Sequence, residues 1–204
     1  MSFLAWLTLL PVCLLGAMSP GPSLAVVVRH TLGGGRSKGI TCAWAHAMGI
    51  GVYALVTMLG LAVVLKEAPM VFKGLSIIGA LFLAWLGFRA LTSKSGIAQK
   101  LAAGESTSFF NAARDGIGIS LFNPKILLFF LALFSQFVVE AKNVWGQAAI
   151  VVTPVLVDGL WYTLVAVLLS HQWVLPKLQR NAVWIDRLSG VVLILLAIRV
   201  LVKI

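Results

Sequence analysis

The chain has 204 residues, of which 60% are hydrophobic and only 11% are charged, and its mean hydropathy is +1.02. A water-soluble domain carries about a quarter of its residues as charges, so the composition excludes one and predicts a protein embedded in a lipid membrane. The net charge of +10 could suggest nucleic acid, but the 16 Lys and Arg residues are spread between apolar segments and form no basic stripe. We therefore expect membrane lipid around the chain and no nucleic-acid partner.

Six apolar segments have the length of about 20 residues that crosses the hydrocarbon of a bilayer. In chain order they cover residues 3–28, 40–65, 70–91, 116–139, 145–169 and 184–202. No Lys or Arg precedes the first segment, so we expect it to be retained as a span and not removed as a signal peptide. The sequence thus predicts an all-α integral membrane protein, with six transmembrane helices in a single domain, residues 1–204.

A polar stretch, residues 92–113, separates two groups of three spans, which we expect to be halves of about residues 1–91 and 114–204. Because three is odd, the halves lie in opposite orientations, as two inverted three-helix repeats do. Ten Lys and Arg residues lie on one side of the spans and five on the other, so the positive-inside rule predicts both termini on the non-cytoplasmic side. The ten are Arg29, Arg36, Lys38, Arg89, Lys94, Lys100, Arg114, Lys177, Arg180 and Arg187, and the five are Lys66, Lys73, Lys142, Arg199 and Lys203.

The first span of each half is interrupted by residues that break helices. The first span contains Ser19-Pro20-Gly21-Pro22 and the fourth contains Asn123-Pro124-Lys125, each about 15 Å from the cytoplasmic end of its span. Proline and glycine disrupt the backbone hydrogen bonds of a helix, and hydrocarbon cannot replace those bonds. A single proline kink would serve packing alone, whereas paired interruptions in corresponding spans are typical of a transporter's binding site. We therefore expect these seven residues to bind substrate.

Two charged residues lie deep inside predicted spans, where a charge costs about 2.5–3.5 kcal/mol on insertion scales. Lys125 is in the fourth span and Asp158 is central in the fifth, so on neighbouring helices they could form a static ion pair. Alternatively they meet the substrate and protons. Asp158 would then bind an ammonium group or carry a proton, and Lys125 would attract a carboxylate. His46, in the second span, could share proton coupling with Asp158 or simply hydrogen-bond a neighbouring helix.

The chain resembles a known family in two stretches, SPGPSLAVVVRHTLGGGRSKGI at residues 19–40 and NPKILLFFLALFSQFV at residues 123–138. Together they are similar to the LysE/RhtB family of amino-acid exporters, and the resemblance covers essentially the whole chain. It implies a secondary transporter in the cytoplasmic (inner) membrane that exports amino acids or related small metabolites by proton antiport. Ser23 stands where the homoserine and threonine branch usually carries Asp or Asn. Asp158-Gly159-Leu160-Trp161-Tyr162 also resembles the fifth span of the family.

Other functions stay open from the sequence. A channel or cation exporter would also place polar groups in the membrane, although no His/Cys/Asp cluster with metal-ligand spacing occurs. A membrane thiol oxidoreductase would need its two cysteines to meet, and helical rise separates Cys13 from Cys42 by about 20 Å. We expect a transporter with alternating access around a midplane site, without catalytic residues, metal or cofactor, which could form a homo-oligomer.

Overall fold

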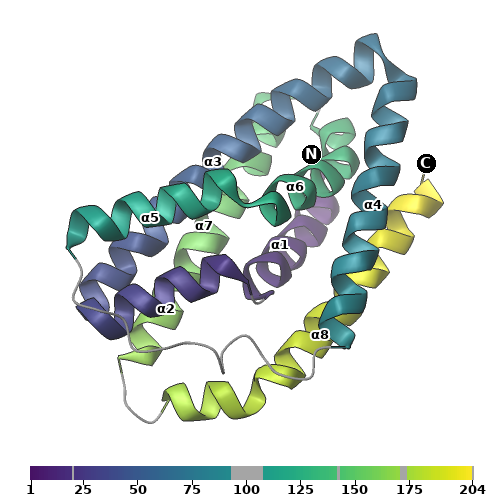
Figure 1. Ribbon diagram of the computed structural model, residues 1–204. Helices are drawn as coiled ribbons and strands as arrows, with labels where there is room; N and C mark the ends of the chain where they lie inside the picture. The colour runs from purple at the N-terminus through teal and green to yellow at the C-terminus, as the bar shows by residue number, and fades with distance from the viewer. Residues whose placement is uncertain (20, 93–107, 142, 171–173, 204) are drawn as a thin grey trace.

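The computed structural model describes residues 1–19, 21–92, 108–141, 143–170 and 174–203 (Figure 1). These residues form α-helices and one short 3-10 helix, which confirms the all-α fold class. The elements are α1 (Phe3–Met18), α2 (Pro22–Gly34), α3 (Arg36–Glu67), α4 (Pro69–Leu91), α5 (Phe109–Phe122), α6 (Pro124–Phe137), η2 (Val138–Glu140), α7 (Val144–Leu169) and α8 (Val174–Lys203).

Three of these helices are long and apolar enough to cross a membrane, over Arg36–Gly60, Pro69–Leu91 and Val144–Leu169. The pair α1 and α2 makes a fourth candidate if the bent pair counts as one span. In place of the predicted fourth span lie two helices of 14 residues each, α5 and α6. Helix α8 begins before the predicted sixth span, and its apolar part covers Leu193–Val202. The six-span inverted arrangement therefore stays a prediction.

Large apolar side chains cover much of the outer surface of the helices. Met70, Phe122 and Trp145 are 83%, 86% and 84% exposed, and Leu4 is 76% exposed. Soluble monomers rarely expose extended apolar surface, because water disfavours it, whereas the hydrocarbon of a bilayer does not. The outer surface thus suits a protein that lies in lipid.

Both predicted helix breaks are present. Helix α1 ends at Met18, α2 begins at Pro22, and the two helices meet at an angle of 62°. Helix α5 ends at Phe122 and α6 begins at Pro124. A proline at the start of a helix loses no intrahelical hydrogen bond, because the first N–H groups have no partner within the helix. Pro22 and Pro124 therefore do more than interrupt a span, since each begins the second helix of its pair.

One predicted boundary is wrong. The sequence predicts a polar stretch over residues 92–113, but helix α5 already begins at Phe109. The Ser108 hydroxyl accepts a hydrogen bond from the backbone N–H of Asn111 at 3.1 Å, which is the action of a helix N-cap. This local cap, which apolar periodicity does not reveal, extends the helix beyond the predicted span. Residues 93–107 lie outside the described part of the chain.

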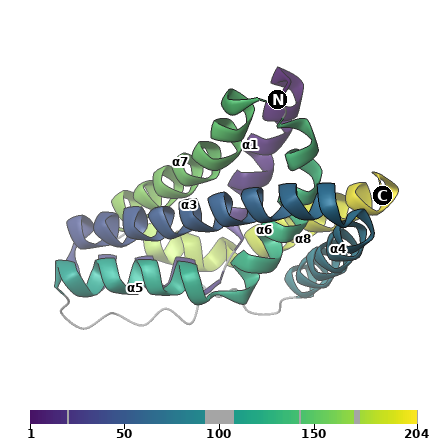
Figure 2. The same cartoon turned by 90° about the horizontal axis from the view of Figure 1, so that it is seen from above.

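The helices pack so that each half of the chain contacts the other. Helix α3 lies between α5 and α7, as the view from above shows (Figure 2). Helices α4 and α8, the last of each half, run side by side. Helix α1 packs on α7 and α5 packs on α3, while α2 packs on α7 and α6 packs on α3, so that contacts between the halves occur in corresponding pairs.

Glycine permits the close packing of α3 and α5. A Cβ atom added to Gly116 would lie 2.4 Å from the carbonyl oxygen of Cys42, which is backbone of α3. One added to Gly49 would lie 1.8 Å from the hydroxyl oxygen of Ser120. Small residues let membrane helices approach to backbone contact, where dispersion forces hold them together. This approach brings the middle of α3 against the second helix break.

Candidate functional site

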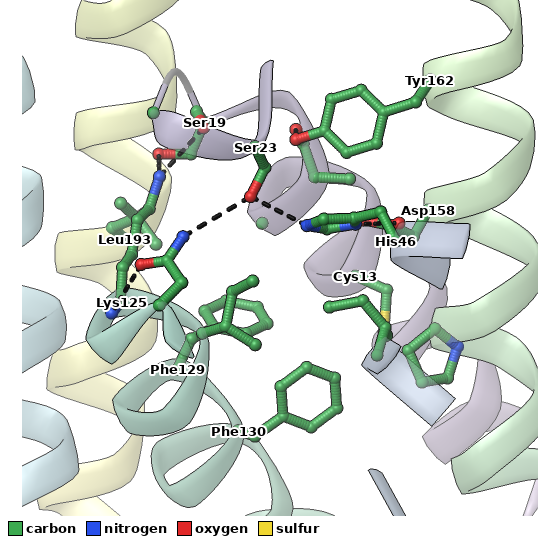
Figure 3. A pocket seen from close by; sticks show the side chains of 17 residues that line it. Cys13, Ser19, Ser23, His46, Lys125, Phe129, Phe130, Asp158, Tyr162 and Leu193 are labelled. Atoms are coloured by element: carbon green, nitrogen blue, oxygen red, sulfur yellow. Dashed lines mark hydrogen bonds and ion pairs between the residues drawn. The ribbon is translucent and has the colours of Figure 1, made fainter. Parts of the chain in front are cut away.

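A cavity lies between the two helix breaks and is walled by α3, α7 and α8 (Figure 3). The cavity has a volume of about 50 Å³, which is large enough to hold water. Most of its polar residues are buried, and an apolar wall completes it. The polar lining residues are Ser19, Ser23, His46, Asn123, Lys125, Asp158 and Tyr162.

Lys125 connects the two breaks directly. Its Nζ donates hydrogen bonds to the carbonyl oxygen of Ser19 at 2.9 Å and to the hydroxyl oxygen of Ser19 at 2.8 Å. An ammonium group that is partly removed from water needs hydrogen-bond acceptors, and the interrupted end of α1 supplies two of them. Gly21 leaves space for this contact, because a Cβ atom there would lie 3.3 Å from Lys125 Nζ.

The side-chain amide of Asn123 forms hydrogen bonds with both helix breaks. Its side-chain oxygen accepts from the backbone N–H of Lys125 at 3.0 Å, so it caps the start of α6. Its amide nitrogen donates to the hydroxyl oxygen of Ser23 at 3.5 Å. Asn123 is thus the second residue that joins the break between α5 and α6 to the break between α1 and α2.

A hydrogen-bonded chain crosses the cavity from α7 to α2 (Figure 3). His46 Nδ1 lies 2.7 Å from a carboxylate oxygen of Asp158, and His46 Nε2 lies 2.9 Å from the Ser23 hydroxyl oxygen. If Asp158 is ionised, Nδ1 donates to it, and Nε2 of a neutral ring accepts from Ser23. The Tyr162 ring packs edge-on against His46 with the ring centroids 5.4 Å apart. The imidazole ring, which belongs to α3, is therefore held by contacts with α2 and α7.

The structure brings together most of the residues that the sequence singles out. Six line the cavity: Ser19, Gly21, His46, Asn123, Lys125 and Asp158. Pro22 is exposed and lines a separate hollow between α2 and α5, whereas Pro20 and the side chain of Pro124 lie outside what the structure describes. Lys125 and Asp158 line the same cavity, but the contacts described above are with Ser19 and with His46.

Sequence reasoning did not single out Ser23 or Tyr162 as site residues. Two signals point to them in retrospect. Ser23 directly follows Pro22 at the start of a helix, where side chains lie close to the break. Tyr162 follows Asp158 by four residues, which places both on one face of α7. Its hydroxyl donates to the carbonyl oxygen of Ala17 at 3.1 Å, near the end of α1.

The two cysteines occupy different clusters of buried residues. Cys13 lines the cavity from α1, and Cys42 lies in α3 among residues of α2, α5 and α7. Both are buried and free. Their placement gives no support to a function that needs a disulfide between them.

A second polar cluster joins α2 to α5 away from the cavity. Asp115 forms an ion pair with Arg29 and a contact of 3.0 Å with Nε2 of His30. Arg114 lies 3.4 Å from the same carboxylate. His30 is 2% exposed, whereas the Arg29 side chain is 54% exposed. The cluster therefore links α2 to α5, one helix from each broken pair.

These features define a multi-pass membrane protein with a polar cavity where two broken helix pairs meet. The LysE type translocator family model matches residues 14–204, and the chain belongs to this family. The resemblance seen in the sequence is thereby confirmed.

Relatives in enterobacteria carry efflux names. The chain is 31% identical to a threonine efflux protein of Salmonella typhimurium over 202 residues, 90% of each chain. It is 28% identical to a threonine efflux protein of Escherichia coli K12 over 197 residues, 91% of each chain. It is also 30% identical to a leucine efflux protein of an Enterobacter species over 135 residues, 66% of this chain and 64% of that one. No solved structure matches the chain significantly.

Proposed function

We propose that the protein exports amino acids across the cytoplasmic membrane in exchange for protons, and that the cavity binds the two alternately. The family and the threonine and leucine efflux proteins among its relatives support amino-acid export. The observation that carries the proposal is that one cavity contains both a half-buried cationic group, Lys125, and a buried carboxylate, Asp158.

Opposite charges in one cavity complement an amino-acid zwitterion. The substrate carboxylate binds near Lys125 and the N-terminus of α2, where the helix dipole is positive. Gly21 caps α2 without a side-chain hydrogen bond, so no side chain of the cap competes for the first N–H groups. The substrate ammonium binds near Asp158, the carboxylate that lines the cavity.

The pairing of Asp158 with His46 supports the proposed exchange for protons. A proton taken up by this pair cancels the negative charge that attracts the ammonium group, so that proton and substrate bind in turn. His46 contacts both Asp158 and Ser23, which gives the proton a short path between α7 and α2. Competition of this kind couples the two fluxes when the site faces the two sides of the membrane alternately and changes sides only with substrate or proton bound.

The corresponding contacts of the two halves support an inverted repeat with six spans. The broken pairs α1–α2 and α5–α6 then count as spans one and four, beside α3, α4, α7 and α8. Under the positive-inside rule both termini are non-cytoplasmic, so α2 and α5 form the cytoplasmic halves of the broken spans. Alternating access consists of separating α2 from α5 while the outer helices α1 and α6 close, and the reverse.

The test uses purified protein in proteoliposomes, with labelled amino acids outside. We expect unlabelled amino acid inside to accelerate uptake of the label, and we expect a pH gradient to drive accumulation. Asp158→Asn should abolish the accumulation driven by pH, because Asn keeps an oxygen for His46 Nδ1 but cannot take up the proton. Asp158→Glu, which keeps the carboxylate, is the matched control.

Two results would contradict the proposal. Uptake that internal substrate does not accelerate would indicate a channel. Undiminished pH-driven accumulation by Asp158→Asn would remove Asp158 from proton coupling.

A further inference from the structure

The cavity is divided into a polar wall and an apolar wall. The hydrogen bonds of Asn123, Ser23, His46 and Asp158 run across it in one row, and Lys125 with Ser19 continues that polar side (Figure 3). Phe129 and Phe130 lie on the other side of the row, away from Ser19 and Tyr162 (Figure 3). The apolar wall, as we call it, consists of Cys13, Ile50, Ile126, Phe129 and Phe130, whereas Leu193 lies on the side of Lys125 in Figure 3.

The apolar wall is built from different helices and is almost fully buried. Ile50 of α3 is 5% exposed, Phe130 of α6 is 3% exposed, and Cys13 of α1 is 5% exposed. Apart from the weakly polar thiol of Cys13, these side chains carry no group that can form a hydrogen bond. A polar group placed against this wall would lose its water without gaining a partner there.

The position of the charges fixes the direction of the substrate's side chain. Lys125 and Asp158 belong to the polar wall, so the carboxylate and ammonium groups of an amino acid bind there. All three substituents leave one Cα atom, so with two of them held at the polar wall, as proposed above, the third extends toward Phe129 and Phe130. The existing contacts of Phe129 limit its movement, because its ring lies against α1 where Gly16 has no side chain.

We infer that the transported amino acids carry apolar side chains, as valine and leucine do, and that hydroxyl and amide side chains are disfavoured. The inference rests on the proposed function, since it assumes that the cavity binds an amino acid. Because relatives are named for both threonine and leucine, the comparisons do not distinguish polar from apolar substrates. The apolar wall favours apolar side chains such as that of leucine. The discrimination is of moderate size, because a hydrophobic pocket rejects an added hydroxyl group by roughly 10- to 100-fold.

Pairs of amino acids with equal shape test the inference. Valine and threonine differ by a methyl and a hydroxyl group, and leucine and asparagine have similar branching. The exchange rate of each of these four amino acids is measured in proteoliposomes. The other amino acids are tested in parallel as competitors. We expect valine to exceed threonine, and leucine to exceed asparagine, at least tenfold in kcat/KM. A smaller ratio in either pair, or exchange of polar amino acids alone, overturns the inference but leaves the proposed function. Absence of exchange for every amino acid overturns the proposed function and the inference with it.

A change in the wall itself supplies the second test. Cys13→Ser adds a hydroxyl to the apolar wall with almost no change of shape, and Cys13→Ala keeps the wall apolar. We expect the valine-to-threonine ratio to be at least threefold lower in Cys13→Ser than in Cys13→Ala, through a lower KM for threonine. Equal ratios in two variants present at equal levels contradict the assignment of this wall to the side chain. If Cys13→Ser does not fold, the amino-acid pairs alone decide.

Discussion

Removal of the Asp115 carboxylate should open the cavity toward the cytoplasm. Asp115 of α5 contacts both Arg29 and His30 of α2, and these are the helices that we propose to separate in the inward-open state. In the present structure the contacts hold α2 and α5 together. We predict that Asp115→Ala shifts the equilibrium between closed and open states toward the open one.

The size of the shift follows from the exposure of the two partners. His30 is 2% exposed, so its bond to a carboxylate is a buried hydrogen bond to a charged group, worth about 1.5–3 kcal/mol. The Arg29 side chain is 54% exposed, and its ion pair adds about 0.2–1 kcal/mol. If the open state lacks both contacts, the total of about 1.7–4 kcal/mol corresponds to a roughly 20- to 900-fold larger open fraction.

Cys13 provides a reporter, since it lines the cavity. In a Cys42→Ala background it is the sole cysteine, because the chain has only two. Its reaction with a small maleimide is followed in inside-out vesicles, where the cytoplasmic face meets the reagent. Labelling of a buried thiol requires opening, so its rate should rise by the same factor, at least about 20, in Asp115→Ala.

The matched control is Arg114→Gln. Arg114 lies on α5 directly before Asp115, so its 3.4 Å ion pair with the Asp115 carboxylate does not join α5 to α2, and its loss should change the labelling rate less than about twofold. If Asp115→Ala, inserted at the normal level, labels Cys13 within twofold of the parent, the contact between α2 and α5 does not close the cavity.

Two further predictions concern packing and orientation. Gly116→Ala should destabilise the protein in detergent by about 1–3 kcal/mol, because its Cβ would lie 2.4 Å from a backbone oxygen of α3. Gly118→Ala is the control on the same helix, where an added Cβ meets nothing within 4 Å, and an equal loss in both would refute this reasoning. A cysteine introduced at Ser95 of a cysteine-free chain should resist a membrane-impermeant thiol reagent added to intact cells, since the positive-inside rule predicts that residues 92–113 lie in the cytoplasm. Rapid labelling would reverse the proposed topology.

The helix breaks could be predicted because their causes are local. Proline and glycine act on the backbone at their own positions, so Pro22 and Pro124 identify the ends of helices without knowledge of the fold. The start of α5 is capped by the hydrogen bond from the Asn111 N–H to the Ser108 hydroxyl. The hydrophobic pattern that predicts spans does not reveal this cap. The predicted boundary at residue 113 is therefore wrong because a helix cap moves the start of α5, whereas the prediction of a helix after the polar stretch is correct.

The partners of the buried charges could not be predicted in the same way. Lys125 and Asp158 were expected to lie deep in the membrane because their neighbours in sequence are apolar. Which group each one meets depends on contacts between distant positions, such as the 112 residues that separate His46 from Asp158. The depth of a residue follows from its place in a span, whereas its rotation about the helix axis and the choice of neighbouring helix follow from packing.

The sequence by itself determined the membrane class, the all-α fold, the two breaks and the family, because composition, backbone chemistry and motif are properties of the chain in its linear order. Only the tertiary structure decided that Lys125 joins Ser19, that His46 lies between Asp158 and Ser23, and that Leu193 belongs to the same cavity as Cys13. These relations arise where helices far apart in the chain are packed within a few ångströms, at places such as Gly116 where a missing side chain permits the approach.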